Sequence, residues 1–174
     1  PYCLNKCSYC DFSSLPVLNK DVLDEYVKAL RLEVSLLAPI YAHCEIATVF
    51  IGGGTPSLLS VSQLESVVSL LGKAFALKSG AEISLEANPA TVSRDKFKGY
   101  QDAGINRISL GVQSFFDDEL KLLGRMHCAR DVWEAVEDLH FLGFADFNID
   151  LIYGLPGQSI KRWEDNLKMA VQSD

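Results

Sequence analysis

IATVFIGGGTPS, residues 46–57, joins a short apolar run to three consecutive glycines. Ile46–Ile51 is nearly unbroken in apolar and β-branched side chains, which is typical of a strand buried on both faces of a parallel sheet. Gly52–Gly54 carry no side chains, so their N–H and C=O groups can approach a ligand closely. The run matches neither G-x-G-x-x-G nor G-x-x-x-x-G-K-S/T, and a nucleotide-phosphate loop is therefore disfavoured.

Strands and helices are predicted to alternate on both sides of this stretch. Apolar spacing, helix caps such as Asn19 and Ser60, and stops such as Pro39 and Gly143 define the elements. The expected strands are 46–51, 82–86, 107–112 and 147–152, and the expected helices are 21–37, from 60, 93–103, 131–142 and from 159. This rhythm predicts an α/β protein with a parallel sheet, a partial TIM-type (β/α) barrel.

No linker, repeat or low-complexity segment interrupts the 174 residues, so residues 1–174 are expected to form one domain. A strand is expected before Cys3, and the last helix runs to Asp174 without a closing strand. We therefore expect four to five βα units of a truncated (β/α)6 barrel, incomplete at both ends and without a C-terminal domain.

Polar groups stand at the predicted carboxyl end of each strand, which is where parallel βα folds gather their functional groups. They are the glycine run, Glu86, Gln113 and Asp150. Because a buried carboxylate without partners is costly, Glu86 and Asp150 inside apolar strands suggest a polar cavity that holds a ligand. The alternative is that these side chains cap neighbouring loops or bind buried water.

Cys3, Cys7 and Cys10 place three of the five cysteines within eight residues. Soft thiolates select zinc, copper(I) or iron-sulfur clusters, and a closed zinc site needs a fourth ligand for which no paired motif exists here. Three cysteines on a [4Fe-4S] cluster leave one iron open to an exchangeable ligand. The alternatives are a structural metal clip with a distant fourth ligand, or thiols that meet in a loop by coincidence.

Composition narrows the classes of partner and compartment. The net charge is -7 and the basic residues are scattered, which argues against nucleic acid as a partner. No apolar run approaches the length of a membrane span. The odd cysteine count suits a reducing compartment, either the cytoplasm or an organelle interior if a targeting segment was removed. Cys44 and Cys128 are expected to be unligated thiols, and His127 is expected to have a structural or surface role.

Six ordered motifs together identify a family resemblance. They are PYCLNKCSYCDF at 1–12, GGGTPS at 52–57, LEANP at 85–89, NRISLGVQSF at 106–115, LGR at 123–125 and DLIYGLPG at 150–157. At these residues the chain closely resembles the radical S-adenosylmethionine (SAM) proteins of the oxygen-independent coproporphyrinogen III oxidase group. Within that group it is most similar to the HemW-type branch of haem chaperones.

The resemblance implies a radical SAM core with a [4Fe-4S] cluster on Cys3, Cys7 and Cys10 and with SAM at the open iron. The family's SAM contacts map onto Tyr9, Gly53, Gly54, Thr55, Glu86, Gln113, Arg125 and Asp150. The implied ligand is haem or porphyrin. The implied protein partners are an electron donor to the cluster and an unknown haem acceptor.

Two functions remain open at this point, and with them the question of whether the protein is an enzyme. Coproporphyrinogen oxidases carry a further cysteine two positions after the triplet, where this chain has Phe12, as HemW-type proteins do. The departure favours a haem chaperone over radical decarboxylation of porphyrinogen propionates. A simple electron carrier would leave the glycine run and the acidic strand ends unexplained.

Overall fold

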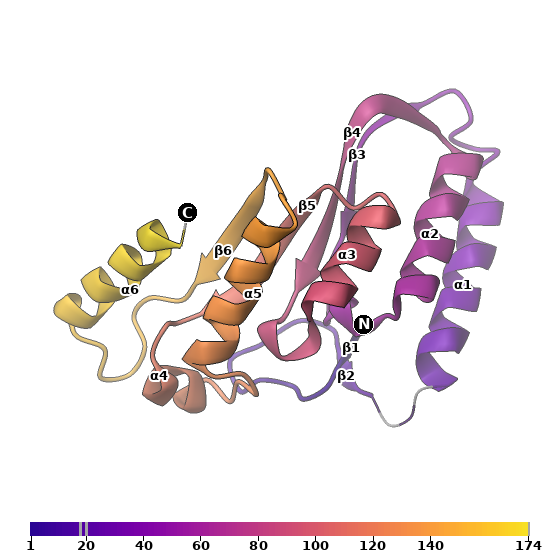
Figure 1. Cartoon of the computed structure of the whole chain (residues 1–174). Coiled ribbons are helices and arrows are strands. Elements are labelled where there is room, and N and C mark those ends of the chain that lie inside the picture. Colours follow the sequence, from indigo (N-terminus) through magenta and orange to yellow (C-terminus); the bar gives the residue numbers. More distant parts are fainter. Residues whose placement is uncertain (18, 20, 174) are drawn as a thin grey trace.

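The computed structural model describes residues 1–17, 19 and 21–173. Its central feature is a four-stranded parallel sheet whose strands follow chain order (Figure 1). The strands are β3 (Glu45–Ile51), β4 (Ala76–Ala87), β5 (Arg107–Gln113) and β6 (Phe147–Leu151). A two-stranded parallel pair is formed by β1 (Tyr2–Cys3) and β2 (Leu15–Pro16). The predicted α/β class and the four predicted strands are confirmed.

Helices cover one face of the sheet, where α3 (Arg94–Asp102) and α5 (Ala129–Phe141) lie in front of the strands in Figure 1. The helices are α1 (Asp21–Leu37), α2 (Val61–Ala74), α3 (Arg94–Asp102), α4 (Asp117–Leu122), α5 (Ala129–Phe141) and α6 (Ile160–Gln172), with 3-10 turns η1 (Pro56–Leu58) and η2 (Pro89–Thr91). The predicted caps form: Asn19 Oδ1 accepts from Val22 N at 3.1 Å, and Ser60 and Gln63 make a capping box. Helix α4 lies where a loop was expected.

The strands alternate between a buried apolar face and a polar face. Ile83, Leu85, Ile108 and Leu110 pack into the core beneath the helices. On the other side, β4, β5 and β6 form a polar face that carries Glu82, Ser84, Glu86, Arg107, Ser109, Asn148 and Asp150. A parallel strand covered by helices on one side needs apolar residues only on that side.

This alternation corrects the prediction that residues 46–51 are buried on both faces. Strand β3 is at an edge of the described sheet, and its Phe50 side chain is 59% exposed. The unbroken apolar run therefore predicted the strand correctly, but it did not indicate that both faces of the strand are buried.

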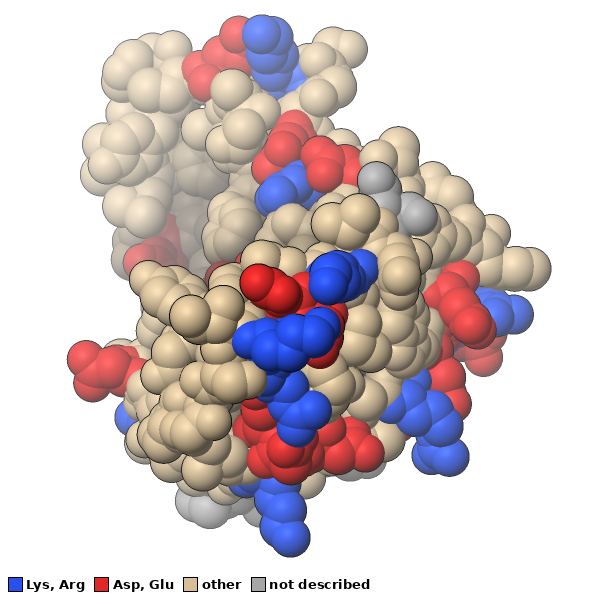
Figure 2. Space-filling model, turned by 90° about the vertical axis from the view of Figure 1, so that its left-hand side faces the viewer, with Lys and Arg blue, Asp and Glu red and all other residues tan. Residues whose placement is uncertain are grey.

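All four strands of the sheet run the same way, so their carboxyl ends meet at one edge, which we call the rim. The cysteine loop, residues 4–14, lies beneath this rim in Figure 1. On the face shown in Figure 2, acidic and basic side chains are interspersed. Ion pairs among the described residues include Arg162 with Asp118 and Lys168 with Asp165. Among the described residues no helix combines the length and the apolar character that crossing a membrane requires.

Candidate functional site

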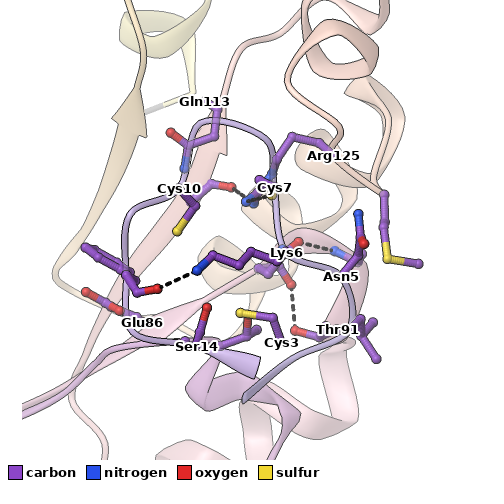
Figure 3. A pocket seen from close by; sticks show the side chains of 18 of the residues that line it. Cys3, Asn5, Lys6, Cys7, Cys10, Ser14, Glu86, Thr91, Gln113 and Arg125 are labelled. Carbon is purple, nitrogen blue, oxygen red and sulfur yellow. Dashed lines mark hydrogen bonds between the residues drawn. The ribbon is translucent and has the colours of Figure 1, made fainter. Parts of the chain in front are cut away.

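A pocket of about 400 Å³ lies between the cysteine loop and the rim (Figure 3). Its lining includes most of the residues that the sequence singled out, namely Cys3, Cys7, Cys10, Tyr9, Gly54, Thr55, Glu86, Gln113, Arg125 and Asp150. Gly53 does not line it, but the Gly53 N–H donates to Glu86 Oε2 at 2.9 Å. Residues that are far apart in the sequence, from the cysteine loop near the start of the chain to β6, therefore line one cavity.

The cysteine loop is closed at its base by the parallel pairing of β1 with β2. Leu15 N donates to Pro1 O and Val17 N donates to Cys3 O, each at 2.8 Å. Cys3 is buried, whereas Cys7 and Cys10 are partly exposed, and all three are free thiols. In the described part of the chain, no three His, Cys, Asp or Glu side chains could share a single metal ion. A cluster that takes one cysteine on each of three irons does not require such a group.

Side chains from the rim contact two of the cysteine sulfurs. Thr55 Oγ1 donates to Cys3 Sγ at 3.4 Å, and Arg125 Nη1 lies 3.8 Å from Cys7 Sγ and 3.5 Å from the Tyr9 hydroxyl. Arg125 Nη2 also donates to Gly111 O at 2.7 Å. Burial raises the pKa of Tyr9 although Arg125 opposes this effect, so the tyrosine is present as the neutral phenol at neutral pH.

Each glycine of the run meets a different steric demand. A Cβ on Gly52 would lie 3.0 Å from the Glu86 carboxyl group, and one on Gly54 would lie 2.6 Å from Tyr2 O. Gly53 has a φ of 121°, a conformation that side-chain-bearing residues rarely adopt. The run therefore allows β1 and Glu86 to approach the same turn, in addition to any approach of a ligand.

The two acidic side chains of the rim are in different environments. Glu86 is half-buried, and burial raises its pKa against the opposing hydrogen bond from Gly53. Asp150 is exposed, and it accepts from Ser109 Oγ at 3.1 Å and from Asn148 Nδ2 at 2.9 Å. The interpretation of Asp150 as a buried carboxylate was wrong, because it stands on the polar face of β6 rather than in the apolar core.

Gln113 has an unusual backbone at the end of β5. Among the residues that the structure describes, Gln113 is the only non-glycine residue with a positive φ, and that angle is 71°. Such strain is stored where the surrounding structure requires it. A Cβ on Gly111 would come within 3.1 Å of Gln113 Nε2, so that glycine leaves room for the amide in the pocket.

Several pocket residues were missed by sequence reasoning. Ser14 and Lys6 line the cavity, and Lys6 Nζ donates to Phe12 O at 3.1 Å across the loop (Figure 3). Asn148, which was also missed, lies outside the lining, and its Nδ2 donates to Asp150 Oδ1 on the same strand. No spacing signal distinguishes these residues, since each acquires its position from loop closure or strand alternation.

The pocket is lined by polar atoms that have no hydrogen-bond partner in the described part of the chain and could bind a polar ligand. Ser14 Oγ and Arg125 Nε are buried and have no hydrogen-bond partner among the described residues. Unpaired buried polar atoms are rare in folded proteins and call for a partner. Three thiols, a guanidinium group and two carboxylates around one cavity also match the donor set that an iron-sulfur cluster with an amino-acid ligand needs.

Behind the rim, His127 supports the loop that carries Arg125. His127 is buried, with Nε2 3.0 Å from Val112 O and Nδ1 3.1 Å from Asn88 Oδ1. It does not line the pocket, and neither do Cys44 and Cys128. This geometry agrees with the structural role expected for His127.

Comparison with known proteins assigns this arrangement to a family. The model of the radical SAM superfamily matches residues 1–170. The chain belongs to the radical SAM superfamily. The family resemblance inferred from the six motifs is thereby confirmed, and the pocket occupies the rim of a radical SAM core.

Within the superfamily, the chain is similar to proteins named for haem metabolism. It is 41% identical to the haem chaperone HemW of Escherichia coli and 38% identical to that of Bacillus subtilis, over 99% and 100% of this chain. The chain spans 46% of the length of each relative. The radical SAM enzyme coproporphyrinogen III oxidase (HemN) of Escherichia coli superimposes with a TM-score of 0.93 at 30% identity, covering all of this chain and 40% of that one. This likeness confirms the partial-barrel core.

Proposed function

We propose that this chain is the radical SAM core of a HemW-type haem chaperone. The observation that carries the proposal is the single pocket that gathers Cys3, Cys7 and Cys10 with polar rim residues of β4, β5 and β6. The similarity to HemW proteins supports the choice of branch, as does Phe12 at the position of a further cysteine. We place the protein in the cytoplasm or an organelle interior.

In this proposal the three cysteines hold a [4Fe-4S] cluster, and residues 1–174 act as one unit of a larger protein. SAM is held by Tyr9, Gly53, Gly54, Thr55, Glu86, Gln113, Arg125 and Asp150. When bound, the cluster and SAM supply one-electron reductive chemistry that no protein side chain provides. The chain's own part is to orient the ligand and to limit its access to water.

Arg125 is suited to pair with the carboxylate of SAM because its buried Nε has no partner among the described residues. Loss of a charge-assisted contact costs about 1.5 to 3 kcal/mol. That corresponds to roughly tenfold to hundredfold weaker binding. Glu86→Gln and Asp150→Asn should also weaken SAM binding, measured in a titration followed by EPR of the reduced cluster. Both variants should still fold and keep the cluster. Variants that bind SAM like the parent but unfold at lower temperature would show a structural role instead.

The experiment that tests the cluster site is anaerobic reconstitution of the full-length protein followed by iron and sulfide analysis. Cys7→Ala should abolish the cluster's visible absorbance, whereas Cys44→Ala, which changes a thiol outside the pocket, should retain it. A cluster that persists in Cys7→Ala would sink the assignment.

A second function, oxygen-independent coproporphyrinogen III oxidase activity, is favoured by the close superposition on the HemN structure. Haem titration and a coproporphyrinogen decarboxylation assay on the same reconstituted sample separate the two functions. We expect haem binding and no catalytic decarboxylation. Decarboxylation at a catalytic rate would reverse the preference. Transfer of haem to an acceptor protein and delivery of an electron by a donor protein are further steps of the chaperone proposal.

A further inference from the structure

Two of the three cysteine sulfurs in the pocket receive hydrogen bonds from side chains on different rim loops. Thr55, after β3, donates to Cys3 Sγ at 3.4 Å, and Arg125, after α4, donates to Cys7 Sγ at 3.8 Å. Within the part of the chain that the structure describes, no such donor reaches Cys10 Sγ. The sulfurs are therefore in unequal electrostatic surroundings.

Both donors are held in place by backbone contacts that involve no ligand. Thr55 N donates to Tyr2 O at 2.8 Å, which fixes the glycine loop against β1, and Thr55 O accepts from Leu58 N at 3.0 Å. Arg125 N donates to Leu120 O at 2.9 Å, and its Nη2 donates to Gly111 O at 2.7 Å. Their approach to the sulfurs is thus a property of the fold.

Hydrogen bonds to the sulfurs are one of the means by which a protein sets the reduction potential of an iron-sulfur cluster. A donor stabilises the reduced state more than the oxidised state, because the extra electron increases the negative charge near the sulfurs. A charged donor such as Arg125 acts more strongly than a neutral hydroxyl.

We propose that Thr55 and Arg125 raise the reduction potential of the cluster by hydrogen-bonding the sulfur atoms of Cys3 and Cys7. This inference rests on the proposed cluster site and adds a second role to two residues assigned to SAM. The reaction concerned is the gain of one electron from an external reductant, with no bond made or broken. The effect does not need SAM, so it is measured in its absence.

The test is a redox titration of the full-length protein, reconstituted anaerobically and free of SAM, with soluble one-electron mediators. Thr55→Val keeps the side-chain shape and removes the donor, whereas Thr55→Ser keeps the hydroxyl. Thr48→Val makes the same chemical change within β3, away from the pocket lining.

We expect Thr55→Val to shift the ratio of oxidised to reduced cluster about tenfold toward the oxidised form at a given potential. For a one-electron couple, this is a fall in midpoint potential of about 59 mV. Thr55→Ser and Thr48→Val should titrate with the parent. A purely structural role for Thr55 would change stability and leave the potential unmoved.

If Thr55→Val binds its full content of iron and has the same midpoint potential as the parent protein, the proposed role of Thr55 is overturned. If Thr55→Val does not assemble a cluster, Arg125→Gln carries the test, since it replaces the charged donor to Cys7 with a shorter neutral amide and should also lower the potential. An unchanged potential in Arg125→Gln would overturn the proposal for that residue. Failure of the parent itself to bind iron would instead refute the proposed function.

Discussion

Replacing His127 with glutamine should remove a pH dependence of stability that the parent protein shows as the pH falls from 6.5 to 4. The His127 side chain is 3% exposed. Burial, aided by the positive charge of Arg125, lowers the pKa of His127 to about 4 from 6.5. The unfolded chain thus accepts a proton at a pH where the folded protein does not.

The direction and size of the effect follow from this difference. Because the folded pKa is below the unfolded one, the stabilisation is complete above pH 6.5 and is lost as the pH falls toward 4. With 1.36 kcal/mol for each pKa unit, the loss is about 2 kcal/mol at pH 5 and about 3 kcal/mol at pH 4. A loss of this size is a large part of the stability of an ordinary domain.

The assay is urea unfolding of the parent and His127→Gln at pH 7, 6, 5 and 4, followed by tryptophan fluorescence. Glutamine can still donate to Val112 O, and carboxylates that titrate in both proteins cancel in the difference. His43→Gln controls for the loss of an exposed histidine. The difference in unfolding free energy between parent and His127→Gln should narrow or reverse as the pH falls; a difference that stays flat would refute the reasoning.

Three further substitutions test the pocket and its support. Burial raises the pKa of Glu86 above 4.5, so the ionised side chain destabilises the folded protein at neutral pH. Glu86→Gln should therefore raise the melting temperature at pH 7, and this gain should shrink as the pH falls toward 4.5. A gain in melting temperature that does not depend on pH would contradict this reasoning. Gly54→Ala should lower iron content and stability because its Cβ meets the Tyr2 backbone, whereas Gly72→Ala, with its nearest contact at 3.8 Å, should not. Lys96→Met removes donors to Ser57 O and Thr91 O, and should cost about 1 to 3 kcal/mol in urea unfolding; an unchanged midpoint would show that these bonds contribute nothing.

Local patterns determined the order of the elements and the chemistry of the first loop. The helix at 21–37 was predicted with the bounds that the structure has, because its apolar spacing and its cap at Asn19 lie within the segment itself. The cysteine spacing and the glycine run likewise identified the family from contiguous residues. Such features depend on neighbours along the chain, which a sequence displays directly.

Only the tertiary structure decided which groups share the pocket and in what state. Ser14 and Lys6 enter it because β1 pairs with β2, and Asp150 is exposed because strand alternation places it on the polar face. Gly54 is required because a Cβ there would clash with Tyr2, which is distant along the chain. The contacts of Thr55 and Arg125 with the cysteine sulfurs arise in the same way. Hydrophobic periodicity in the sequence predicts which side chains are buried. It does not predict contacts between distant segments, because these depend on strand order, register and loop closure.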